Sequence, residues 1–150
     1  MHRLPLPPVF TRLTGLQQAP PEGEFRPHNI TINATQMNTT DLTNTPCLAC
    51  NGDVPLLSEL AVQTQMAALD ENWQLTASNT TITRRYNVKG FAKAVYLANL
   101  AAFLADREGH HPDIEFGWGY CAVSFTTHDA GGLTINDFIC AQKLDTLTQS

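Results

Sequence analysis

Charged residues are scarce in this chain of 150 residues: Asp, Glu, Lys and Arg make up only 15%, and the net charge is -5. The nine Lys and Arg residues form no cluster at any point of the sequence. Nucleic acids and anionic membrane surfaces both bind through concentrated positive charge. We therefore expect neither as a partner.

Long apolar runs are missing as well. The longest mostly apolar stretch, residues 92–105, contains Lys93 and Asn99 and is too polar for a membrane span. At the N-terminus, prolines at positions 5, 7 and 8 interrupt the apolar stretch that a signal peptide needs around Leu4 and Leu6. This argues against a signal peptide and for a cytoplasmic protein. Apolar residues still make up 43% of the chain, enough for the packed core of one domain of ordinary size.

Cysteine occurs four times, at positions 47, 50, 121 and 140. Four cysteines could form two disulfides or a zinc site, but without export reduced thiols are the expectation. Cys47 and Cys50 form a single Cys-x-x-Cys with no second pair at zinc-ribbon spacing. We interpret them as two reduced thiols, with a redox or metal role as the alternative.

The first 45 residues differ in composition from the rest. They are rich in proline, residues 28–45 are dominated by Asn and Thr, and apolar periodicity is absent. This composition predicts a disordered extension over residues 1–45, followed by one globular domain over residues 46–150. Met37 is an alternative start of translation. A transit peptide is less favoured because of Glu22 and Glu24.

Hydrophobic patterning from residue 46 onward predicts the order helix, strand, strand, helix, strand, strand, helix. The expected helices cover Leu56–Leu69, Phe91 to about Ala105, and Thr134 to about Leu147. The expected strands cover Trp73–Leu75, Ile82–Val88, Ile114–Trp118 and Cys121–Thr127. Strands joined by short turns should be antiparallel. The fold class is therefore α+β, a two-layer domain with a four-stranded antiparallel sheet and helices packed on one face.

Local signals mark two helix ends. Gly109 stands where a left-handed C-terminal cap belongs, and Pro112 cannot continue a helix. Thr134 and Asp137 form a variant of the capping box at the start of the last helix. Residues 110 and 111 are therefore expected directly after a helix end.

Three of the five histidines lie in the globular part, and each follows the end of a rigid element. His110 and His111 follow the second helix, and His128 follows the last strand. Such positions can converge on one cleft, where histidines donate and accept protons near neutral pH. Asp106, one turn before His110, and Asp137, at the start of the last helix, could orient the imidazoles.

These side chains favour proton-transfer chemistry such as the elimination of water, because no activated serine or cysteine nucleophile accompanies them. A metal site with histidine ligands is an alternative, although no His-x-x-x-His or cysteine-rich knuckle supports it. A simpler alternative is that each histidine is an ordinary surface or strand-end residue, since none of them alone is diagnostic. Gly131-Gly132 beside His128 lets backbone amides approach a ligand.

The histidines and aspartates belong to a longer pattern of fixed spacing. Asp106 precedes His110-His111-Pro112 by three intervening residues, and Trp118 follows six residues after the proline. Thr127-His128 then stands before a Gly-Leu-Thr turn, with Asp137 nine residues after the histidine. This pattern resembles the signature of the pterin-4a-carbinolamine dehydratases from about Cys47 to Leu147, and the Cys-x-x-Cys resembles their bacterial branch. Two positions depart from it, since Glu is commoner at 106 and animal members often have Trp at 114.

The resemblance implies dehydration of 4a-hydroxytetrahydropterin to quinonoid dihydropterin, in the recycling of the tetrahydropterin cofactor of aromatic amino acid hydroxylases. It implies a histidine acid/base set with no metal and no organic cofactor, made of His110, His111 and His128. The implied pterin site contains these three residues and Pro112, Thr127, Asp129 and Ala130. The implied supporting residues are Asp106, Trp118 and Asp137.

The resemblance also implies partners. Family members are homodimers or homotetramers, and an aromatic amino acid hydroxylase would supply the substrate. Animal members also stabilise dimers of a transcription factor, so a non-catalytic binding module is the alternative function. The presence of all three histidines favours turnover, because a pure binding module has no need of them.

Overall fold

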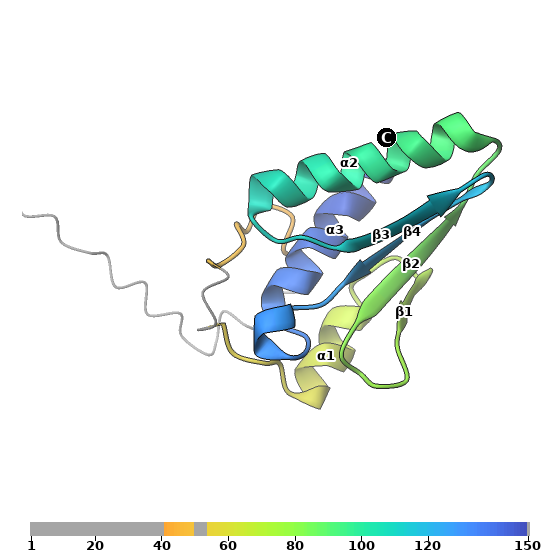
Figure 1. Ribbon diagram of the computed structural model, residues 1–150. Coiled ribbons are helices and arrows are strands. Elements are labelled where there is room, and N and C mark those ends of the chain that lie inside the picture. Colours follow the sequence, from red (N-terminus) through yellow and green to blue (C-terminus); the bar gives the residue numbers. More distant parts are fainter. Residues whose placement is uncertain (1–40, 50–53, 150) are drawn as a thin grey trace, which may run out of the picture. The chain divides into compact units, whose positions relative to one another are not determined.

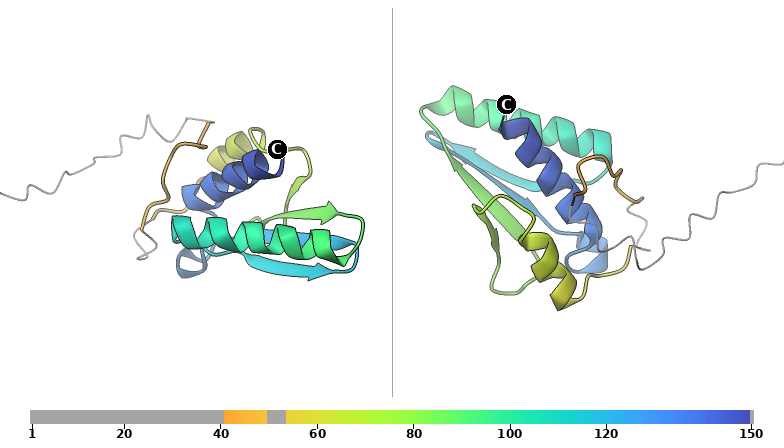
Figure 2. Two further views of the ribbon diagram at one scale, coloured as in Figure 1. Left: turned by 90° about the horizontal axis from the view of Figure 1, so that it is seen from above. Right: turned by 180° about the vertical axis from the view of Figure 1, so that it is seen from behind.

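The computed structural model describes residues 41–49 and 54–149, and the structural statements below concern this part of the chain. Four strands form one antiparallel sheet in the order β1 (Trp73–Leu75), β2 (Ile82–Asn87), β4 (Tyr120–Phe125) and β3 (Asp113–Gly117). Three helices lie on the same side of this sheet, α1 (Glu59–Met66), α2 (Phe91–Glu108) and α3 (Ile135–Thr148) (Figures 1 and 2). The predicted α+β class and two-layer arrangement are confirmed.

The core lies between the helices and the inner face of the sheet. On β4, Cys121, Val123 and Phe125 are buried, whereas the residues between them are half-buried on the open face. This alternation follows from the two-residue period of a strand. α2 faces the sheet with buried alanines at positions 94, 98, 101 and 105, and these small side chains allow its backbone to pack closely.

Both predicted helix-end signals are confirmed. Gly109 ends α2 in the left-handed conformation with φ of 66°, and its N–H donates to Ala105 O. The capping box of Thr134 and Asp137 begins α3. With 18 residues, α2 is the longest described helix, and no helix in the described part of the chain is long and apolar enough to cross a membrane.

Several predicted boundaries differ from the structure. The first helix is shorter than Leu56–Leu69, because Ser58 caps its N-terminus and Leu57 N–H donates to Leu133 O at 2.9 Å. Trp118 lies in the turn after β3 rather than in the strand. Residues 128–130, expected as an irregular loop, form a 3-10 turn, η2 (His128–Ala130).

The segment of residues 41–49, called here the N-terminal segment, packs on α3. Leu42 belongs to the hydrophobic core, and its N–H donates to Gln142 Oε1 at 2.7 Å. Leu42 thus packs with the core, although the composition assigned it to the extension, because one buried leucine anchors an otherwise polar stretch. Residues 1–40, with Met37, and Cys50 lie outside the described residues.

Candidate active site

His110 and Asp137 form a buried pair where the end of α2 meets the start of α3. His110 Nε2 lies 2.7 Å from Asp137 Oδ1; the histidine is only 3% exposed and the aspartate is fully buried. Asp137 Oδ2 accepts hydrogen bonds from Thr127 Oγ1 at 2.9 Å and from Thr134 N–H at 2.7 Å. Because an ionised carboxylate only accepts, we infer that His110 carries a hydrogen on Nε2.

The backbone and the sheet fix the His110 ring in addition to Asp137. The left-handed turn at Gly109 brings His110 back toward the helix, where its N–H donates to Ala105 O at 3.2 Å. The ring stacks on Phe125 at the end of β4, with centroids 6.0 Å apart and planes inclined by 14°. This histidine is therefore held rigidly by α2, α3 and the sheet.

The three predicted catalytic histidines share one cavity of about 210 Å³. Gly109, His110 and His111 line it from the end of α2, and the segment after β4 supplies the remaining lining residues, Thr126, Thr127, His128 and Asp129. His111 and His128 are exposed, in contrast to His110. Two imidazoles that a ligand can reach thus stand beside one that is fixed in the protein.

Asp113 is a site residue that the sequence analysis did not single out. Its carboxylate Oδ2 lies 3.7 Å from His128 Nε2, and both side chains are well exposed, at 72% and 66%. Asp113 begins β3 directly after Pro112 and is paired with Ser124 of β4, four residues before His128. Its place next to His-His-Pro was the available signal, but the contact depends on strand register.

The remaining predicted site residues lie at different distances from the cavity. Pro112 and Ala130 adjoin lining residues in the chain, and both are half-buried. Asp106 is exposed on α2, and among the described residues no hydrogen bond or ion pair joins it to a histidine. Within residues 41–49 and 54–149, the carboxylate bound to the His110 ring is that of Asp137.

Trp118 is not brought to the cavity within this chain. It is 79% exposed in the turn between β3 and β4, at the far end of β3 from Asp113. A strand advances about 3.3 Å per residue, so roughly 13 Å separate the two ends of β3, Asp113 and Gly117. Figure 1 shows this turn and η2 at opposite ends of the sheet.

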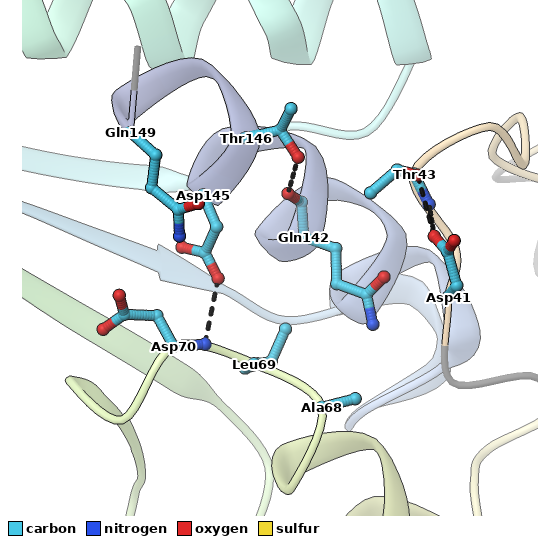
Figure 3. Close-up of a pocket in the computed structure, with 9 residues that line it drawn as sticks. All are labelled: Asp41, Thr43, Ala68, Leu69, Asp70, Gln142, Asp145, Thr146 and Gln149. Atoms are coloured by element: carbon cyan, nitrogen blue, oxygen red, sulfur yellow. Dashed lines mark hydrogen bonds between the residues drawn. The ribbon is translucent and has the colours of Figure 1, made fainter.

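Two cavities that are each more than twice as large lie away from the histidines. The cavity in Figure 3 has a volume of about 560 Å³ and is lined by residues that include Asp70, Gln142 and Asp145. Asp145 accepts hydrogen bonds from Trp73 Nε1 at 2.8 Å, from Asp70 N–H at 3.1 Å and from Arg84. Arg84 also pairs with Asp70 at 3.2 Å.

The second larger cavity, of about 590 Å³, contains the ion pair of Lys143 and Glu108 at 2.6 Å. No described histidine lines either of these two cavities, and their Asp145 and Glu108 carboxylates form ion pairs with Arg84 and Lys143. In the described part of the chain, no three His, Cys, Asp or Glu side chains converge as metal ligands do. By size alone, these two cavities would be the better candidates for an active site. The histidine cavity holds the side chains suited to proton transfer, and we assign the candidate site there.

Similar known proteins carry the name of one family. The sequence pattern of the family described as pterin 4 alpha carbinolamine dehydratase matches residues 55–147. A Legionella pneumophila protein provisionally named a pterin-4-alpha-carbinolamine dehydratase is 39% identical over 109 residues, covering 73% of this chain and 96% of its own length. A Paracoccus denitrificans protein of the same name is 48% identical over 94 residues, covering 63% of this chain and 87% of its own.

A solved structure agrees with the sequence relatives. The crystal structure of a transcriptional coactivator/pterin dehydratase from Brucella melitensis matches with a TM-score of 0.57 and 28% identity, over 61% of this chain and 97% of that chain. The family match contains the whole sheet and all three cavity histidines. The chain therefore belongs to the pterin 4 alpha carbinolamine dehydratase family, a family of hydro-lyases.

Proposed function

We propose that this chain removes water from 4a-hydroxytetrahydropterin and releases quinonoid dihydropterin. The observation that carries the proposal is the cavity in which exposed His111 and His128 stand beside buried His110. Family membership supports the substrate class, because the relatives carry the name of this reaction. The role in recycling the cofactor of an aromatic amino acid hydroxylase, and a cytoplasmic location, belong to the same proposal.

The reaction needs one proton donor and one proton acceptor. A proton moves to the 4a-hydroxyl oxygen, the carbon–oxygen bond breaks, and its electron pair leaves with the water. A base removes the proton of a ring N–H, and the electron pair of that bond completes the new carbon–nitrogen double bond. His111 and His128 suit these two steps, because both are exposed in the cavity and imidazole exchanges protons near neutral pH.

His110 suits a positioning role better than proton exchange with the substrate. Its Nε2 is bound to Asp137, and the ring is almost wholly buried against Phe125. A rigid neighbour restricts the backbone from which His111 projects. We thus divide the three histidines of the expected acid/base set into two proton carriers and one positioning residue.

The test is a stopped assay with freshly generated 4a-hydroxytetrahydropterin. His111→Ala and His128→Ala should each lower the dehydration rate by about 10²- to 10⁴-fold, the usual contribution of a general acid or base. His28→Ala, the same substitution outside the matched region, should retain full activity. Full activity of both cavity variants, with the wild-type circular dichroism spectrum, would contradict the assignment.

A homodimer or homotetramer is part of the proposal. Tyr96 and Phe103 are exposed seven residues apart on α2, which places both aromatic rings on one face of the helix. Exposed apolar faces of this kind are commonly buried between subunits. Analytical ultracentrifugation of the full chain should show an oligomer, and Tyr96→Lys with Phe103→Lys should shift it toward the monomer.

A non-catalytic binding module is the second candidate, favoured by one observation. The similar Brucella melitensis protein is described as a transcriptional coactivator as well as a pterin dehydratase. The two functions give different results in the same assay. A pure binding module would show no turnover with 4a-hydroxytetrahydropterin, whereas the dehydratase would accelerate the reaction in proportion to protein concentration.

A further inference from the structure

Cys47 and Cys140 bring two thiols into contact from distant parts of the chain. Their Sγ atoms are 3.5 Å apart, although 93 residues separate them in sequence. Cys47 is half-buried in the N-terminal segment, and Cys140 is fully buried in α3. Neither residue lines the histidine cavity, so the proposed dehydration gives no role to this pair.

The position of Cys47 is set by its neighbours and is not left to a loose loop. The Asn136 side chain accepts from Leu48 N–H at 2.8 Å and donates to Leu48 O at 2.9 Å. The thiol of Cys47 lies 3.8 Å from Asn136 O. Asn136 and Cys140 are one helical turn apart on the same face of α3. An amide that binds residue 48 therefore places residue 47 over Cys140.

A second anchor comes from α2. Cys47 N–H donates to Glu108 Oε2 at 3.4 Å, and the same oxygen lies 2.6 Å from Lys143 Nζ. Burial alone would raise the pKa of Glu108, but the hydrogen bonds from Lys143 and Cys47 outweigh it, and the pKa lies below its usual value. The carboxylate is therefore ionised at neutral pH and keeps its bond to the segment.

We propose that Cys47 and Cys140 form an intramolecular disulfide when the protein meets a small-molecule disulfide such as oxidised glutathione. A disulfide needs an Sγ–Sγ distance of about 2.05 Å, so the sulfur atoms must approach by roughly 1.5 Å. The N-terminal segment is joined to α3 by hydrogen bonds to the side chains of Asn136 and Gln142. The segment can therefore supply this movement while α3 stays in place.

The chemistry proceeds by two exchanges. The thiolate of Cys47, the more accessible residue, attacks one sulfur of the reagent; the reagent's S–S bond breaks, and its electron pair leaves with the first thiolate. The thiolate of Cys140 then attacks the Cys47 sulfur, and the second thiolate leaves. Two electrons pass from the cysteines to the reagent, and the two thiol protons end on the two released thiols.

The second exchange should depend strongly on pH. In the reduced protein, hydrogen bonding to Cys47 and burial raise the pKa of Cys140, and the contribution of burial remains once Cys47 is part of the mixed disulfide. Thiolate is the attacking form, so ring closure from the mixed disulfide should be slow at neutral pH and faster as the pH rises.

The bond would tie the N-terminal segment to the helix turn that carries Asp137. It would also close a loop that contains the sheet, α2 and the three cavity histidines. Closing a long loop restricts the unfolded chain, so the oxidised protein should melt on the order of 10 °C higher than the reduced protein. The pair is thus a modification site that stabilises the domain from outside the cavity.

The experiment uses the full chain with reduced and oxidised glutathione at pH 8, followed by alkylation, digestion and mass spectrometry. One tryptic peptide contains both Cys47 and Cys50, and another contains both Cys121 and Cys140. A disulfide between these two peptides would therefore not reveal which cysteines it joins. The double variant Cys50→Ser, Cys121→Ala removes this ambiguity. We expect it to lose both remaining thiols, to give a peptide joining residues 47 and 140, and to melt on the order of 10 °C higher until dithiothreitol is added.

Cys47→Ser is the matched control, because residue 47 is half-buried and tolerates a polar side chain better than buried residue 140. It should fold, and its melting temperature should not respond to glutathione. A disulfide between Cys47 and Cys50 in the wild type, or glutathione mixed disulfides alone, would overturn the proposal. These readouts do not involve turnover, so failure of the dehydratase assay would leave them unaffected.

Discussion

Two buried carboxylates of α3 stand at opposite ends of the helix and have different partners. Asp137, in the first turn, binds His110, whereas Asp145, eight residues later and about 12 Å along the helix, binds Arg84 and Trp73 Nε1. Arginine keeps its charge at every relevant pH, while histidine gains and loses a proton near neutrality. The Asp145 pair is a fixed ion pair, and the Asp137 pair adjoins the cavity where we propose that protons are exchanged.

The comparison shows that a buried ion pair beside a large cavity does not by itself identify an active site. The cavity near Asp145 is larger than the histidine cavity. However, the partner of Asp145, the Arg84 guanidinium, also stacks on the Tyr86 ring, 4.5 Å from the ring centroid. At the other end of α3, exposed His111 and His128 stand beside the buried pair. The identity of the cation and the exposure of its neighbours distinguish a structural tie from a candidate active site.

Asp145→Ala should give the largest effect on stability. The substitution leaves the Arg84 guanidinium and the Trp73 indole N–H without their carboxylate in a part-buried place. Removing one partner of a buried charge pair costs about 3–5 kcal/mol of unfolding free energy. Urea unfolding measures this loss, and the folded fraction should still turn over 4a-hydroxytetrahydropterin at the wild-type rate. A strong loss of turnover in fully folded protein would contradict the structural role.

Asp137→Asn should lower turnover more than stability, the opposite of what we expect for Asp145→Ala. The amide keeps the shape but loses the charge that holds His110, so the imidazole can rotate out of place. We expect a loss of about 1–3 kcal/mol in stability, and a fall of roughly tenfold to a hundredfold in the dehydration rate, as for displaced catalytic groups. Steady-state kinetics should show the change mainly in kcat, since we propose that His110 positions His111 and exchanges no proton with the substrate. A change in KM alone would assign Asp137 to substrate binding instead.

Local sequence signals predicted the elements near both carboxylates well. β1 matches Trp73–Leu75, and α2 ends at Gly109, because alternation, helical periodicity and a left-handed cap are properties of a few neighbouring residues. The first helix was predicted too long because Leu57 N–H binds Leu133 O, a long-range contact invisible to periodicity. Leu42 was assigned to the extension for the same reason, since its burial depends on Gln142.

The candidate site could be predicted only in part. The spacing of the histidines and Asp137 in the sequence pointed to one cavity, and the structure places His110, His111 and His128 there. Trp118 and Asp113 show what spacing cannot convey. The register of β3 against β4 brings Asp113 to His128 and sends Trp118 to the far turn. Register is a property of the folded sheet, so a one-dimensional pattern does not reveal it.

High pH should weaken the Asp145 end of α3 through Tyr86. Burial raises the pKa of Tyr86 to about 12 in the folded protein, against 10.0 for the free side chain. Because the folded pKa is the higher one, stability is complete below pH 10 and decreases as the pH rises toward 12. The loss should reach about 1–2 kcal/mol, since Tyr86 is only half-buried.

Tyr86→Phe should abolish this alkaline loss, which urea unfolding between neutral pH and pH 12 would measure. Tyr120→Phe, which changes a tyrosine at the start of β4, is the control and should leave the loss in place. An equal response of both variants would show that Tyr86 does not carry the effect.

Asp113→Asn should give the smallest effect and sharpens the comparison at the histidine end. The pair of Asp113 and His128 is exposed at both partners, and such pairs contribute about 0–1 kcal/mol to stability. Unfolding should therefore hardly change, whereas turnover should fall about twofold to fivefold if the carboxylate restricts the His128 ring near the substrate. Glu115→Gln is the matched control, because Glu115 is exposed two residues further along the same face of β3. Equal turnover in the two variants would show that Asp113 does not position His128. A fall in turnover in Asp113→Asn alone would assign this exposed carboxylate a role in orienting His128, comparable to the role of buried Asp137 at His110.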